Sequence, residues 1–78
     1  MDAIEQIRAA LGEDDPITTM RALAIDLAGR GLSQAAIEGA FGAVASELYE
    51  SGRDEEAGWV IEVLDMIGEW YAAGKPID

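Results

Sequence analysis

The stretch from Asp54 to Tyr71, DEEAGWVIEVLDMIGEWY, constrains the fold most, because it is the longest apolar run and contains both tryptophans. Its apolar residues recur at spacings of three and four, which predicts an amphipathic helix. A chain of 78 residues has only one small core to offer, so the other segments must pack around this helix. The face expected to pack inward comprises Val60, Leu64, Ile67 and Tyr71.

Glycine-containing turns divide the preceding chain into three further helical segments. The expected helices are Ala3–Leu11, Pro16–Ala28 and Gln34–Glu50. No alternating apolar and polar run competes with them as a strand. Four helices joined by short turns predict an all-α fold, a small antiparallel helical bundle with three longer helices and a short N-terminal helix. We expect residues 1–78 to form a single helical domain.

Each expected helix starts at or after a residue that can accept hydrogen bonds from the free amides of a first turn. The expected caps are Asp2, Asp15, Ser33 and Asp54. The acids at 13–15 are interpreted as part of a helix start, because they lack the spacing of a calcium-binding loop. Gly74 and Pro76 are expected to end the last helix and leave a short tail, Lys75–Asp78.

The two middle helices differ in how clearly they show a core face. The second has a broad apolar arc of Ile17, Leu23, Ala24, Leu27 and Ala28. The third has a bulky stripe of Ile37, Phe41, Val44 and Leu48. Nearly opposite that stripe lie only small side chains, namely Ala35, Gly39, Gly42, Ala43 and Ser46.

The two glycines in this small-residue face cost about 1 kcal/mol each relative to alanine, so a compensating contact is expected. One interpretation is the close approach of another helix, within the domain or across a homodimer. The other is a flat groove for a partner protein.

Histidine and cysteine are both absent, which excludes several functions. No Ser/His/Asp or Cys/His catalytic set can form, and no disulfide or thiolate zinc site is available. The glycines around Arg30 do not match a phosphate-binding motif. We therefore expect a protein that is not an enzyme and that has no cofactor and no metal site.

Sixteen acidic residues against five basic ones give a formal net charge of −11. Such a charge opposes binding to nucleic acids and anionic lipids and favours a protein partner with a basic surface. The segment GRGLSQAAIEGAFG has the outline of a helix-turn-helix motif, but it lacks side chains suited to base edges and phosphates. The simpler explanation of the charge is solubility alone.

Four acids form a row along the last expected helix: Glu55, Glu62, Asp65 and Glu69. Glu62 and Glu69 stand about 10 Å apart by the helical rise. A rigid row of carboxylates can imitate a phosphate backbone and occupy a basic nucleic-acid-binding surface. A straight row does not surround a metal ion, so the alternative is a solvated face. Further acids that could widen the row are Asp26, Glu38, Glu47 and Glu50.

Aromatic and sulfur-containing side chains lie about 100° from the expected core face of the last helix. These are Trp59, Met66 and Trp70, and Tyr49 on the third helix could join them. They are expected either to form the edge of the core, to form a homodimer seam, or to anchor a partner protein.

Residues 69–75, EWYAAGK, resemble the end of the last helix in colicin-type nuclease immunity proteins, which are acidic four-helix proteins of similar size. The resemblance covers under a tenth of the chain. The adjacent tyrosine pair of that family is absent, because Tyr49 and Tyr71 are isolated from each other, and no binding residue is carried over.

The sequence thus predicts a non-catalytic acidic interaction module that binds another protein with a basic surface. An inhibitor or immunity-type antagonist of a nucleic-acid-binding protein fits this description. The alternative is a homodimeric structural or adaptor module whose acidity serves only solubility. No apolar run reaches the roughly 18 residues of a membrane span, and the start MDAIEQIR is unlike a signal peptide. We therefore expect no membrane or direct nucleic-acid binding, and a cytoplasmic location.

Overall fold

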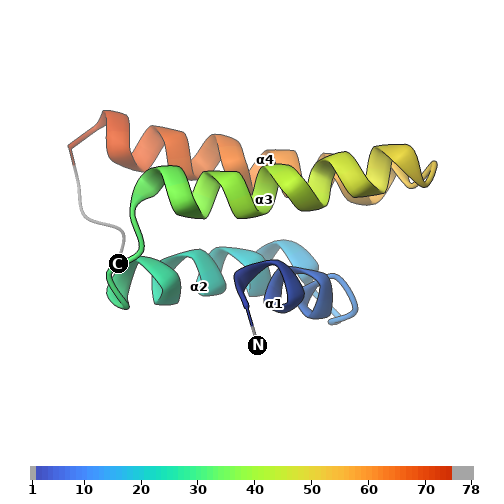
Figure 1. Ribbon diagram of the computed structural model, residues 1–78, viewed down its shortest axis with the longest axis horizontal. Helices are drawn as coiled ribbons and strands as arrows, with labels where there is room; N and C mark the ends of the chain where they lie inside the picture. The colour runs from blue at the N-terminus through green and yellow to red at the C-terminus, as the bar shows by residue number, and fades with distance from the viewer. Residues whose placement is uncertain (1, 75–78) are drawn as a thin grey trace.

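The computed structural model describes residues 2–74, which form four helices (Figure 1). They are α1 (Ala3–Ala10), α2 (Pro16–Gly29), α3 (Gln34–Glu50) and α4 (Asp54–Ala72). The expected all-α fold is confirmed, with α1 the short helix, and each observed end lies within one residue of the expected one. The expected tail after Gly74 lies outside the described residues.

Three of the four expected caps are confirmed. The Asp2 carboxylate accepts from the Glu5 amide at 2.9 Å, and the Ser33 hydroxyl oxygen accepts from the Ala36 amide at 3.1 Å. Asp15 likewise accepts from the amide at position 18 and precedes a proline, which suits the first turn of a helix.

The expected cap at Asp54 is wrong, because Asp54 is already the first helical residue of α4. The cap position is occupied by Arg53, whose side chain makes no capping hydrogen bond. The Arg53 amide donates to the Leu48 carbonyl at 2.8 Å and closes the end of α3, so the chain enters α4 one residue earlier. The carboxylates of α4's first turn instead interact favourably with the helix dipole.

The helices form two layers (Figure 1). α3 and α4 form one antiparallel pair, α1 and α2 form the other, and α1 lies against α3 while α2 lies against α4. Consecutive helices are antiparallel, so α1 and α3 run in the same direction. α4 therefore sits between two neighbours, which widens the arc that it buries.

The core lies between the layers and takes side chains from all four helices. Val60 and Ile67 are completely buried, whereas Leu64 and Tyr71 pack against the core and remain partly exposed. The wider arc of α4 also buries Ala57 and Val63, which the sequence analysis did not include. The bulky stripe of α3 is buried as expected.

Met20 of α2 is fully buried, although the sequence analysis placed other residues at the centre of this face. The expected arc contributes two buried residues, Ala24 and Leu27, and its other members are partly buried. Within residues 2–74, no helix combines the length and hydrophobicity that crossing a bilayer requires.

Candidate protein-binding surface

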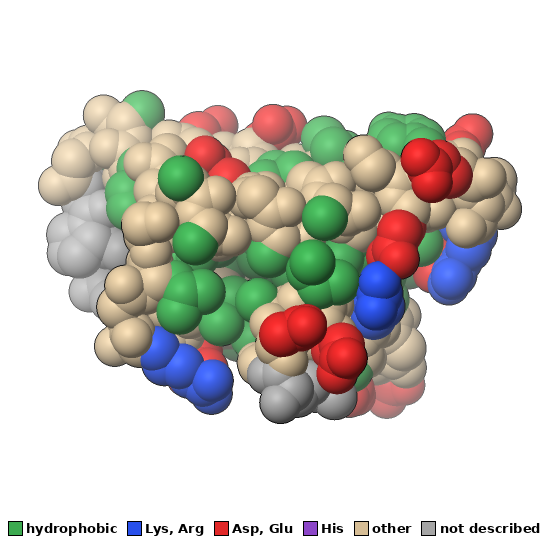
Figure 2. Space-filling model, in the orientation of Figure 1, with side chains coloured by type: hydrophobic (Ala, Val, Ile, Leu, Met, Phe, Trp, Pro, Cys, Tyr) green, Lys and Arg blue, Asp and Glu red, His purple; other side chains and the backbone are tan. Residues whose placement is uncertain are grey.

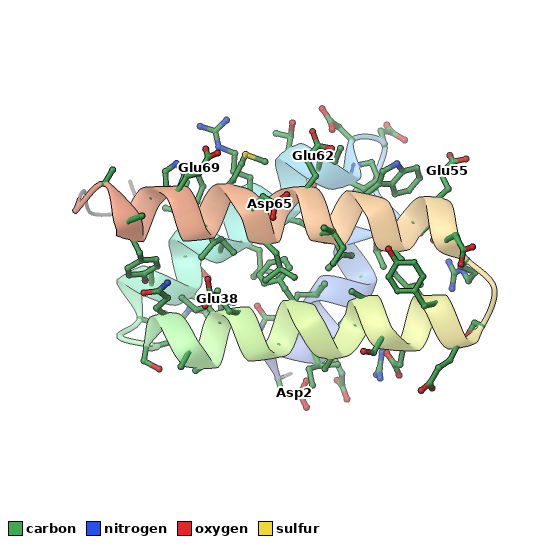
Figure 3. All side chains as sticks on the ribbon, turned by 90° about the horizontal axis from the view of Figure 1, so that it is seen from above. Asp2, Glu38, Glu55, Glu62, Asp65 and Glu69 are labelled. Atoms are coloured by element: carbon green, nitrogen blue, oxygen red, sulfur yellow. The ribbon has the colours of Figure 1, made fainter. Side chains whose placement is uncertain are left out.

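The acidic row of α4, comprising Glu55, Glu62, Asp65 and Glu69, lies on the outside of the molecule (Figure 3). All four side chains are exposed. Glu55, Glu62 and Glu69 recur every seven residues, which places them on nearly the same line with a spacing of about 10 Å. Asp65 is turned from this line toward α3. The row therefore presents its carboxylates to solvent from one straight, rigid element.

None of the ion pairs of the described residues includes a member of this row. Arg8 binds Glu47, Arg30 binds Asp26 at 2.8 Å, and Arg53 binds Glu56. Asp26 and Glu47 could have widened the acidic row by their sequence positions. Each is paired with an arginine, so neither adds an unpaired carboxylate to it. On the face seen in Figure 2, basic side chains are few and stand apart from one another. Among residues 2–74, no basic side chain therefore neutralises the carboxylates of the acidic row by an ion pair.

The small-residue face of α3, which comprises Ala35, Gly39, Gly42, Ala43 and Ser46, is not covered by another helix. Four of its residues are exposed and Gly42 is half-buried. A Cβ atom added at Gly39 or Gly42 would meet no atom within 4 Å. The expected close approach of a helix within the domain is therefore wrong, because α1 and α4 pack on the other sides of α3.

α4 contains two further glycines, Gly58 and Gly68, which were not predicted as open positions. A Cβ atom at Gly58 would meet nothing within 4 Å, and one at Gly68 would meet only the Glu38 Oε2 atom at 3.9 Å. Glu38 lies on the side of α3 that faces α4 (Figure 3). The sequence signal that could have identified these open positions is a glycine inside a helix, because such a glycine lowers the stability of the helix and brings no evident benefit within the chain.

Two large apolar side chains are exposed on the α3–α4 pair. Tyr49 of α3 is 53% exposed and Ile61 of α4 is 37% exposed. The exposure of Ile61 was not predicted, although it lies one helical step, about 100°, from the buried Val60, and this rotation was the available signal. The outer surface of α3 and α4 therefore combines small residues, free carboxylates and limited apolar area.

Trp59, Met66 and Trp70 share one side of α4, and Trp70 contacts α2 there. All three are half-buried and pack against the core. The Arg21 guanidinium of α2 lies over the Trp70 ring, 5.6 Å from its centroid, in the geometry of a cation–π contact. These side chains thus contribute to joining the two layers.

The described residues contain no group of three or more acidic side chains placed to hold a metal ion. The carboxylates of the row project in parallel from one helix, so they do not converge on a common point. What the surface can do chemically is attract cations and accept hydrogen bonds from lysine or arginine.

No protein-family model, curated protein or solved structure shows a significant match to this chain.

Proposed function

We propose that the protein is a non-catalytic binding module that uses the outer surface of α3 and α4 to bind a protein with a basic surface. The observation that carries this proposal is the acidic row of α4, whose four exposed carboxylates form no ion pair with any described residue. In a protein of net charge −11, such a row produces a directed negative field that steers a basic partner.

The small-residue face gives the surface a shape that suits a protein partner. Gly39 and Gly42 leave the α3 backbone open to close approach, and the acidic row runs along the neighbouring helix α4, with Asp65 turned toward α3. Tyr49 and Ile61 supply the exposed apolar area that favours dehydrated contact. A basic partner can therefore pack closely against α3 while its cations reach the carboxylates of α4.

An inhibitor or immunity-type antagonist of a nucleic-acid-binding protein is the form of this function that the charge pattern supports best. Regularly spaced carboxylates on a rigid helix compete with phosphates for the same lysine and arginine side chains. In this proposal the protein acts in the cytoplasm and binds neither nucleic acid nor membrane itself.

The test begins with affinity capture from the native host, using three forms of the protein. These are the wild type, the double variant Glu62→Lys/Glu69→Lys, and the control Glu13→Lys/Asp14→Lys in the loop between α1 and α2. Both double variants change the formal net charge from −11 to −7, so they differ only in the position of the change. A true partner should be retained by the control and lost with the α4 variant.

The captured partner is then purified and its association rate is measured by surface plasmon resonance at increasing salt. We expect the rate for the wild type to fall by about tenfold or more between low and high salt, because electrostatic steering is screened. Circular dichroism should show that both variants remain folded. If both double variants bind equally well, the acidic row is only a solvated face.

A homodimeric module is the second candidate, and the open small-residue face of α3 favours it. Two copies could pack through Gly39 and Gly42 at close helix–helix distance. Two chains of charge −11 repel each other, so the affinity of a homodimer should rise with salt. The affinity for a basic partner should instead fall with salt. Sedimentation equilibrium at low and high salt, with Gly39→Leu as the disrupting variant, distinguishes the two candidates.

A further inference from the structure

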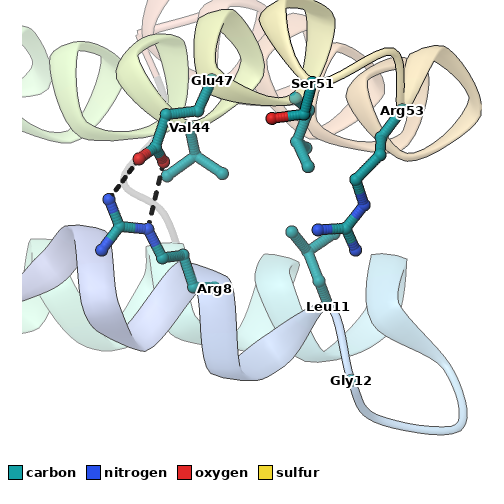
Figure 4. A pocket seen from close by; sticks show the side chains of 8 residues that line it. Arg8, Leu11, Gly12, Val44, Glu47, Ser51 and Arg53 are labelled. Carbon is teal, nitrogen blue, oxygen red and sulfur yellow. Dashed lines mark hydrogen bonds and ion pairs between the residues drawn. The ribbon is translucent and has the colours of Figure 1, made fainter.

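A cavity of about 360 Å³ opens between the C-terminal end of α1 and the α3–α4 turn (Figure 4), and no member of the acidic row lines it. It has the size of a site for a small ligand. α1 ends at Ala10 while α3, running in the same direction, continues to Glu50, so the last turn of α3 extends past α1. The residues that line the cavity are Arg8, Leu11, Gly12, Val44, Glu47, Leu48, Ser51 and Arg53.

The cavity wall is apolar at its centre and polar at both ends. Leu11 reaches in from α1, and Val44 and Leu48 come from the inner face of α3. Arg8 stands at one end and Arg53 at the other, and the Ser51 side chain lies between them (Figure 4). Half of the four arginines that the structure describes therefore line this one cavity.

Both arginines are held in place and keep unused donors. Arg8 donates from Nε to Glu47 at 3.0 Å and also from one terminal nitrogen, and Arg53 donates from Nε to Glu56 at 2.8 Å and from one terminal nitrogen. A guanidinium has five N–H donors, so each arginine retains three. The side chains of Arg8 and Arg53 are 50% and 54% exposed, which leaves these donors accessible.

We propose that this cavity binds a carboxylate attached to a short hydrocarbon chain. The carboxylate would accept from the free donors of Arg53 and from the Ser51 hydroxyl, in the fork geometry that arginine favours. The hydrocarbon would cover Leu11, Val44 and Leu48. The net charge of −11 opposes an anion at long range, but physiological salt screens charges beyond about 8 Å. Close by, Glu47 and Glu56 each pair with one of the two arginines. The carboxylate therefore relies on the donors that Arg53 keeps free and on the Ser51 hydroxyl.

The chemistry has two sources, a free short-chain acid and the C-terminal carboxylate of a peptide. The probes are hexanoate, 1-hexanol, an N-acetylated peptide that ends in leucine, and the same peptide with an amidated end. Each is titrated into the ¹⁵N-labelled protein near physiological salt, and amide chemical shifts are recorded. We expect a carboxylate probe to shift the amides of Leu11, Gly12, Leu48 and Ser51 and to bind at least about tenfold more tightly than its uncharged counterpart.

Variants separate recognition of the carboxylate from general apolar binding. Arg53→Met should weaken binding of the carboxylate by about tenfold and leave 1-hexanol unchanged, because one charge-assisted contact is lost. Arg53→Lys should weaken it less. The matched control is Arg30→Met, which removes an arginine from the Asp26 pair on α2 and should have no effect.

Three results would overturn the proposal. They are the failure of both carboxylate probes to bind more tightly than their uncharged counterparts, shifts confined to residues outside the cavity, and unchanged carboxylate binding in Arg53→Met. Binding of the leucine peptide but not of hexanoate supports the proposal and assigns the site to chain ends, whereas binding of hexanoate alone supports it for free acids. None of these results depends on the partner of the α3–α4 surface.

Discussion

At the scale of residues, Gly52 and Gly39 affect the stability of the fold in opposite ways. Gly52 has a φ of 75°, a backbone conformation that glycine adopts without strain, and it turns the chain between α3 and α4. Gly39 lies inside α3 with ordinary helical geometry and with open space where a side chain would be. The first glycine is required by the fold, while the second lowers the stability of the helix that contains it.

Alanine substitutions at these two positions should therefore change the free energy of unfolding in opposite directions. Gly39→Ala should raise it by about 0.5–1 kcal/mol, because alanine has the higher helix propensity and its Cβ meets nothing. Gly52→Ala should lower it by about 1 kcal/mol or more, because alanine is strained at positive φ. Urea denaturation of both variants beside the wild type measures the two shifts. A loss of stability in Gly39→Ala would contradict the open geometry of the α3 surface.

Residue chemistry also shows where sequence reasoning succeeds and fails. Asp2, Asp15 and Ser33 were predictable as caps because a cap needs only its own oxygen and an amide three residues later. The place of Asp54 within α4 was not predictable, because the start of this helix depends on the hydrogen bond from the Arg53 amide to the Leu48 carbonyl at the end of α3. The exposure of Ile61 was not predicted, because it depends on which helices pack against α4.

At the scale of elements, α1 depends on its neighbours. Eight residues are too few for a helix that is stable alone in water, so α1 is held by Ile7 in the core and by the Arg8–Glu47 pair. This pair joins α1 to α3, whereas the other ion pairs of the described residues each lie within four residues along the chain. Among the described residues, it is the ion pair that links the two layers.

The Arg8–Glu47 pair should make stability depend on pH in the acid range. The hydrogen bond from Arg8 holds the pKa of Glu47 below its ordinary value; burial opposes this lowering, and the positive charge of Arg8 adds to it. A lowered folded pKa gives stability that is present above the ordinary value of about 4.3 and is lost as pH falls through the folded pKa. Glu47→Gln should thus be less stable than the wild type near pH 6, and the difference should shrink toward about pH 3.

Thermal denaturation at a series of pH values measures this difference directly. Glu50→Gln is the matched control, because Glu50 is an exposed carboxylate of the same helix without an ion pair to any described residue. It should differ little from the wild type in how stability varies with pH. A constant difference between Glu47→Gln and the wild type across the range would show that the pair does not stabilise the docking of α1.

Element boundaries and buried faces were largely predictable, because helical spacing and turn residues are local properties. The exceptions arise where an element contacts two neighbours. α4 packs against both α3 and α2, so Ala57 and Val63 are buried on the flanks of the expected face. Met20 was missed because the α2 sequence places apolar residues on more than one side.

At the scale of the whole molecule, the packing order was not predictable from the chain. α2 and α3 follow each other in sequence but lie diagonally, and α1 contacts α3 without contacting α4. Helical periodicity predicts which face of a helix is buried, but it does not predict which other helix packs against that face. The position of the acidic row was predictable, but that none of the four described arginines pairs with it could be seen only in the structure.

The net charge of −11 should make the folded state more stable as salt increases, because screening reduces repulsion between carboxylates. A gain of about 1 kcal/mol would raise the melting temperature by about 4–8 °C in a domain of this size. Differential scanning calorimetry at low and high sodium chloride measures the shift. The variant Glu13→Lys/Asp14→Lys, with a net charge of −7, should show a smaller rise. A melting temperature that does not change with salt would mean that the charges are already too far apart to interact.

The unequal lengths of α1 and α3 have a consequence for how relatives of this chain could diverge. By the helical rise, α1 spans about 12 Å and α3 about 25 Å, so the space beneath the last turn of α3 arises from the path of the backbone. Substitutions in its walls reshape that space, whereas an insertion of one helical turn after Ala10 would fill it. Insertions and deletions at this single joint would therefore create or remove the cavity and leave the surface of α3 and α4 intact.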